Sequence, residues 1–198
     1  KVLKILSERI HLVNWKNKNW SDATPLYIAC RYGHEKVVEI LIKNGANVNL
    51  ADTDGRTPLY IACANGYEKV VEILIKNGAN VNSMTTDGET PLYIACAFGH
   101  REIWRIVAKH GGMIPESLIS KLKGKMKPEE FKEMNQLIFI ASVKKGDIEE
   151  VRRMIEKGRR MKEEKIEMER KDEEEKKTAL EHSIESGNRG MTEILIIE

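Results

Sequence analysis

One seven-residue segment, Thr-Pro-Leu-Tyr-Ile-Ala-Cys, occurs three times in this chain, beginning at Thr24, Thr57 and Thr90. The copies are separated by 33 residues in both intervals. A constant period of this length is typical of repeat proteins, in which one supersecondary unit stacks on copies of itself. We therefore expect a linear array, because a single unit buries too little apolar surface to fold alone.

Each copy opens a pattern of two short helices. Thr24 can cap the first helix, and Pro25 suits its first position because the N–H that proline lacks would be unpaired there. Gly33 ends this helix, since glycine tolerates a positive φ. An apolar stripe over residues 37–42 predicts the second helix. Turn-forming Asn, Asp and Gly residues after Gly45 then indicate a hairpin-like connection to the next unit.

These units resemble the ankyrin repeat, whose signature is Thr-Pro-Leu-His-x-Ala with a period of 33 residues. Tyr27, Tyr60 and Tyr93 stand where the family usually has histidine, and we interpret them as a stacking ladder. The resemblance is strong from Trp20 to Gly111 and weak outside that range. The expected fold is an all-α ankyrin-repeat solenoid of stacked helix-turn-helix units with hairpin connections and two insertions in its C-terminal half.

The repeat pattern places residues 1–198 in one solenoid domain. Its predicted segments are a partial leading repeat (1–18), three regular repeats (19–51, 52–84 and 85–112), a helical insertion (113–131), a degenerate repeat with a charged insertion (132–172) and a truncated last repeat (173–198). The spacing of Phe131, Met134, Ile138 and Ala141 predicts that the second insertion segment continues into the degenerate repeat as one helix. The chain begins in mid-repeat without Met, so we expect it to be a piece of a longer protein.

Charge and cysteine content limit the classes of function. The 33 basic and 31 acidic residues nearly balance, which argues against general binding of nucleic acid. No stretch approaches 18 apolar residues, so no membrane span is expected. Cys30, Cys63 and Cys96 occupy equivalent repeat positions, and helices stacked about 8–10 Å apart would hold them beyond disulfide range. Buried, reduced thiols favour an intracellular location, cytoplasmic or nuclear.

No motif predicts catalysis, a metal site or a cofactor. His34 and His100 share one repeat position, but Tyr67 replaces them in the middle repeat, so we interpret both as structural residues at a helix start or loop. Cys30 and His34 are not accompanied by the second pair of ligands that zinc commonly uses. A nucleophile beside a base is not recognisable in the sequence. The chain is therefore predicted not to be an enzyme.

Variation between the repeats indicates where a partner would bind. In ankyrin-type proteins the concave surface consists of the hairpin tips and the exposed side of each first helix. The repeats of this chain differ at such positions, where stacking requires no particular residue. Aromatic and Arg side chains there are the usual interface anchors. The predicted partner-binding residues are Trp20, Arg31, Tyr32, Asp54, Arg56, Asn65, Met84, Asp87, Glu89 and Phe98.

The leading functional hypothesis is a monomeric, non-enzymatic interaction module. It would bind a partner protein of unknown identity through its concave face and hairpin tips, without nucleic acid or membrane. Two alternatives stay open at this point. The array could regulate or target a larger enzyme that this chain does not include. Alternatively, the insertion at residues 113–135 could bind a small anionic ligand or nucleotide, with the lysines between Lys121 and Lys127 meeting the anion.

Overall fold

The computed structural model describes residues 12–122 and 124–162. By its internal contacts the chain divides into two compact units, Lys1–Gly146 and Asp147–Glu198. In the second unit, residues 148–162 are helical as far as the description extends. Most of the partial leading repeat and the whole of the truncated last repeat lie outside the described residues.

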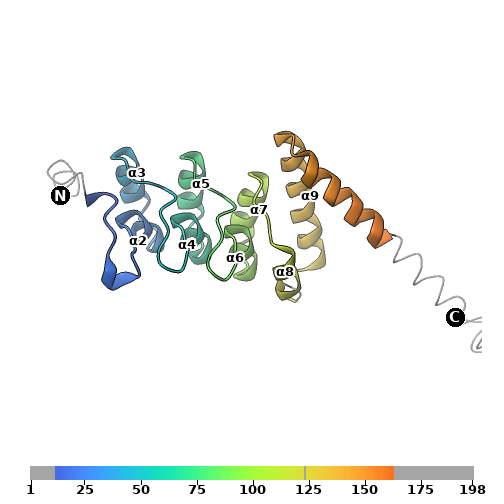
Figure 1. Cartoon of the computed structure of the whole chain (residues 1–198), viewed down its shortest axis with the longest axis horizontal. Coiled ribbons are helices and arrows are strands. Elements are labelled where there is room, and N and C mark those ends of the chain that lie inside the picture. Colours follow the sequence, from blue (N-terminus) through green and yellow to red (C-terminus); the bar gives the residue numbers. More distant parts are fainter. Residues whose placement is uncertain (1–11, 123, 163–198) are drawn as a thin grey trace, which may run out of the picture. The chain divides into compact units, whose positions relative to one another are not determined.

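Three pairs of short helices form the centre of the first unit (Figure 1). The first helices of the pairs are α2 (Pro25–Arg31), α4 (Pro58–Asn65) and α6 (Pro91–Ala97), and the second helices are α3 (Glu35–Lys43), α5 (Glu68–Lys76) and α7 (Arg101–Lys109). First helices pack against first helices, and second helices against second helices. This two-layered array confirms the predicted solenoid. The described part of the chain contains no strand, only one isolated bridge between Asn17 and Ala23.

The Thr-Pro segments start the first helices as predicted. In each repeat the threonine Oγ1 accepts a hydrogen bond from the backbone N–H of the tyrosine three residues later, at 3.2 Å. The tyrosine rings lie in the stacked core, since Tyr27, Tyr60 and Tyr93 are only 3%, 7% and 5% exposed. The same local chemistry therefore caps each first helix and positions one ring per repeat.

Three connector asparagines, Asn14, Asn49 and Asn82, join each unit to the next. In every case Nδ2 donates to a glycine carbonyl, and Oδ1 accepts from the backbone N–H two residues after that glycine, at 2.8–3.2 Å. The bonded residues are Gly45 with Asn47, Gly78 with Asn80, and Gly111 with Met113. Asn14 therefore makes the same two bonds to the following repeat as Asn49 and Asn82 make.

The hairpin tips are joined by backbone hydrogen bonds as well. Thr53 N–H donates to Ser21 O, and Thr86 N–H donates to Asp54 O, both at 2.9 Å. The first tip also contains the 3₁₀ helix η2 (Lys18–Trp20). It is followed by two consecutive non-glycine residues with positive φ. The tips thus form a continuous row whose first member has a distinct shape.

The insertion after the third repeat forms α8 (Glu116–Ile119), the 3₁₀ helix η3 (Ser120–Leu122) and the beginning of α9 (Pro128–Lys145). Helix α9 runs without a break into the degenerate repeat and ends at Gly146, so the predicted single helix is confirmed. Among the described helices, none combines the length and apolar character that crossing a membrane requires.

Helix α9 packs along α7, a second helix, whereas a regular first helix packs on the preceding first helix. The two helices run in the same direction. Near their starts Arg101 of α7 pairs with Glu130 of α9, and the Lys145 side chain at the end of α9 lies over Gly111, just after the end of α7. The degenerate repeat therefore joins the array by a different contact from the regular repeats.

A reversal of charge accompanies this contact. Arg105 occupies the position of Glu39 and Glu72 in the earlier second helices. Its Nε donates to Glu133 Oε1 of α9 at 2.7 Å, and Arg101 also pairs with Glu133 at 3.4 Å. The third repeat is thus charge-matched to α9, whereas the first two carry the opposite charge at that position.

Candidate partner-binding face

Hairpins and first helices border one row of tyrosines. Tyr60 of α4 donates from its hydroxyl to Glu89 Oε2 of the next hairpin, at 2.5 Å. Burial and then Asp52 raise the pKa of Tyr27, and Arg56 of the second hairpin and Arg31 at the end of α2 oppose this rise. Helix ends and hairpins therefore share one surface. We call it the groove face and define it as residues 17–23, 31–32, 52–56, 64–65, 84–89 and 97–98.

The ten predicted partner-binding residues lie on this face, and eight of them have exposed side chains. Four are large and apolar: Trp20, Tyr32, Met84 and Phe98 are 55%, 53%, 59% and 63% exposed. Aromatic residues and Met are enriched in protein interfaces relative to other surface. Exposed Arg31, Asp54, Asn65 and Asp87 surround them with polar groups.

The two remaining predicted residues, Arg56 and Glu89, are half-buried and already bonded within the chain. Arg56 pairs through Nε with Asp52 Oδ2 at 2.8 Å and through Nη2 with Asp54 Oδ2 at 2.6 Å. The Asp52 side chain is only 1% exposed. Glu89 accepts the hydrogen bond from Tyr60. Arg56 and Glu89 thus hold the hairpins in shape, and a partner would meet Arg56 as half of an ion pair.

Histidine rings support the exposed aromatics of the groove face. His34 stacks on Tyr32 with 6.1 Å between ring centroids, and His100 stacks on Phe98 at 6.3 Å. Both histidines are N-cap residues of second helices, which confirms the helix-start position predicted for them. His100 Nε2 also lies 3.1 Å from the Ala64 carbonyl oxygen, a hydrogen bond to the preceding repeat.

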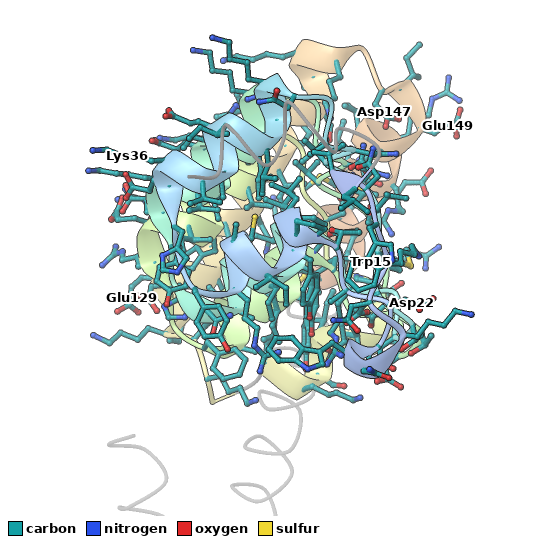
Figure 2. All side chains as sticks on the ribbon, turned by 90° about the vertical axis from the view of Figure 1, so that its left-hand side faces the viewer. Trp15, Asp22, Lys36, Glu129, Asp147 and Glu149 are labelled. Carbon is teal, nitrogen blue, oxygen red and sulfur yellow. The ribbon has the colours of Figure 1, made fainter. Side chains whose placement is uncertain are left out.

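Two exposed aromatic side chains were not among the predicted residues. Tyr67 is 36% exposed, and its ring covers Gly33 of the preceding repeat so closely that a Cβ there would lie 2.5 Å from it. Trp15 is 53% exposed and lies beside the first hairpin with Asp22, on the side opposite Lys36 of α3 (Figure 2). Tyr67 could have been found from the sequence, because it shares the repeat position of His34.

The described residues offer little reactive chemistry. No group of three or more His, Cys, Asp or Glu residues among them is arranged to hold a metal ion. Cys30, Cys63 and Cys96 are free and buried. Burial raises the pKa of each thiol, that of Cys96 to about 12, so all three stay protonated at neutral pH.

Fold and face together define a repeat solenoid with a long exposed surface. The family model described as ankyrin repeats (3 copies) matches residues 1–85, and that part of the chain is similar to ankyrin repeats. Proteins of this family generally act as protein–protein interaction modules. A similar protein is the chicken (Gallus gallus) Arf-GAP with coiled-coil, ANK repeat and PH domain-containing protein 2. It is 50% identical over 44 residues, which are 22% of this chain and 6% of that relative.

Proposed function

We propose that this chain is a non-enzymatic interaction module that binds a partner protein through the groove face. The observation that carries the proposal is the pair Tyr32 and Phe98. They occupy equivalent positions in the first and third repeats, are 53% and 63% exposed, and are held by stacking on His34 and His100. A ring fixed in this way loses little conformational entropy on binding, and aromatic residues are frequent hot spots.

Further groups on the same face support this assignment. Trp20 and Met84 on the hairpin tips extend the apolar contact area. Arg31, Asp54, Arg56, Asn65, Asp87 and Glu89 supply the polar rim that interfaces usually have. The proposal includes a single monomeric solenoid over residues 1–198 with the segment boundaries predicted above, acting inside the cell without nucleic acid, membrane or cofactor.

An affinity pull-down from native lysate tests the proposal. The wild-type chain is compared with the Arg31→Ala/Tyr32→Ala/Phe98→Ala variant, and retained proteins are identified by mass spectrometry. We expect a protein that the wild type retains and the variant loses. A control variant, Lys36→Ala/Glu39→Ala/Glu72→Ala, changes three exposed residues on second helices and should retain it. Equal recovery with the groove-face variant would contradict the proposal.

The similarity to the chicken protein favours a second candidate function. By its name, that relative combines ANK repeats with a coiled coil and a PH domain in an Arf-GAP. The present chain could in the same way be the regulatory or targeting array of a larger enzyme. The full-length reading frame decides between the two, because the second candidate requires a catalytic domain in the same polypeptide.

A further inference from the structure

The charge of the groove face changes sign from the first repeat to the third. In the first repeat Lys18 and Arg31 are exposed, and neither forms an ion pair with another described residue. The half-buried Asp22 is the only acidic residue in the first-repeat part of the groove face, residues 17–23 and 31–32. In the third repeat Asp87 and Glu89 are the charged residues of the face, with no Lys or Arg beside them in 84–89 or 97–98. The two ends of the face therefore favour ligand charges of opposite sign.

The charges in the middle of the face are paired within the chain, and one negative charge is left over. Arg56 is bonded to both Asp52 and Asp54, so the second repeat lies between the basic first repeat and the acidic third repeat in net charge. The tyrosine row reflects the same trend. Burial and then Asp52 raise the pKa of Tyr27 while Arg56 and Arg31 oppose the rise, whereas burial and then Glu89 raise the pKa of Tyr93. The separation of charge thus extends across the repeats.

The stacking distance sets the length scale of this pattern. Neighbouring packed helices lie about 8–10 Å apart, so equivalent points of the first and third repeats are about 16–20 Å apart. An extended peptide advances about 3.3 Å per residue and would cover that distance in about five to six residues, of which six is the even spacing. An even spacing also leaves both side chains on the same side of the extended chain. The exposed rings of Tyr32 and Phe98 lie at the two ends of the interval.

We infer that the groove face binds an extended segment of a partner protein with an acidic residue at the first repeat and a basic residue about six positions away at the third. Apolar side chains of the same segment contact Tyr32 and Phe98. The inference rests on the proposed function, because it assumes that the groove face is the binding surface. Charge complementarity of this kind fixes the direction of the bound segment, since the reversed segment would bring like charges together.

A display library of random 16-residue peptides, selected on the whole chain, tests the inference. The enriched peptides are expected to share an acidic and a basic residue about six positions apart. The tightest peptide is then synthesised, and its affinity is measured by fluorescence anisotropy. Arg31→Glu should weaken binding about tenfold, and exchanging the peptide's acidic residue for Lys should restore it. Asp87→Lys should likewise weaken binding, and exchanging the peptide's basic residue for an acidic one should restore it. Glu39→Lys, which reverses the charge of an exposed residue on α3, is the control and should leave the affinity for the peptide unchanged.

The outcomes separate this inference from the proposed function. Enriched peptides could lose binding to Tyr32→Ala/Phe98→Ala and yet carry no charge pair, or bind equally well to both charge-reversed variants. Either result would overturn the inference and would still support the groove face as the binding surface. A spacing of about 11–13 residues would indicate a bound helix and overturn the extended segment. Binding that survives the loss of both rings would overturn the inference and count against the proposed function. Failure to enrich any peptide would overturn the inference alone, since it claims that a short linear segment is sufficient.

Discussion

Tyr27 and Tyr60 occupy the same position in successive repeats, but their hydroxyl groups meet different surroundings. Tyr60 donates to Glu89, whereas the buried Tyr27 hydroxyl has no hydrogen-bond partner among the described residues. Asp52 lies near Tyr27, but its carboxylate already accepts from the Arg56 side chain and from hairpin amides. The two positions therefore form a matched pair for measuring what the hydroxyl contributes.

We expect Tyr60→Phe to lower the free energy of unfolding by about 1–2 kcal/mol, because it leaves the half-buried Glu89 without its donor. Tyr27→Phe should be neutral or slightly stabilising, because it removes a buried hydroxyl that makes no hydrogen bond. Urea denaturation followed by circular dichroism measures both changes. Equal losses in the two variants would show that the Tyr60–Glu89 hydrogen bond contributes nothing specific.

Gly33 and Gly99 are a second matched pair, since both have positive φ, 69° and 73°. A Cβ at Gly33 would lie 2.5 Å from the Tyr67 ring, whereas a Cβ at Gly99 would meet nothing within 4 Å. Alanine at either position should lower the free energy of unfolding by about 1–2 kcal/mol, because its Cβ is strained in the left-handed backbone conformation. Gly33→Ala should cost a further 1–3 kcal/mol or so for overpacking.

A double-mutant cycle with Tyr67→Ala separates the two costs of Gly33→Ala. Removing the ring should recover most of the extra loss at Gly33 and none of the loss at Gly99. Thermal or urea unfolding of the three single variants and the two double variants is sufficient. Additive effects of Gly33→Ala and Tyr67→Ala would exclude the predicted clash.

At the scale of elements, the contact between α7 and α9 depends on charge. Desolvation opposes ionisation of Glu133, but its hydrogen bonds and attraction to Arg105 and Arg101 outweigh this and lower its pKa. A carboxyl with a lowered folded-state pKa stabilises the folded contact above its unfolded value, about 4.3, and the stabilisation is lost as pH falls through the folded value. Acid should therefore loosen α9 before it affects the regular repeats.

Arg105→Glu restores the charge found at Glu39 and Glu72 and should release α9 at neutral pH. Hydrogen exchange of residues 128–145 is the measurement, and exchange there should become faster while residues 58–76 stay unchanged. Glu133→Arg in the same chain should recover protection by reversing the pair. Unchanged exchange in Arg105→Glu would show that apolar contacts alone hold α9.

The sequence predicts some elements better than others for a physical reason. The Thr-Pro helix starts, the glycine helix ends and the single helix from the insertion into the degenerate repeat follow from local chemistry and period, and all are present. The packing of α9 along α7 was not predictable, because it depends on Arg101 and Arg105 meeting glutamates across a long insertion. On the groove face, exposure of the variable positions could be predicted, but the internal bonds of Arg56 and Glu89 could not.

For the whole molecule, stability should be greatest where repeats have neighbours of their own kind on both sides. Nearest-neighbour contacts dominate the energetics of solenoids, and end units open first. We expect amide hydrogens within residues 24–107 to exchange most slowly. Equal or slower exchange over residues 178–198, which lie outside the described residues, would contradict this and indicate an additional contact at that end.

The connector asparagines also bear on how a gene for such a chain can change length. Because Asn14, Asn49 and Asn82 make the same two bonds at three junctions, a loss of residues 50–82 would bring Asn49 to the place of Asn82, with Gly111 and Met113 as its new partners. Duplication or deletion of 33 codons would then preserve the two asparagine hydrogen bonds at the junction. It nevertheless moves the basic and acidic ends of the groove face one repeat closer together or farther apart. Recombination in whole periods would thus alter which partner is bound without disturbing the fold.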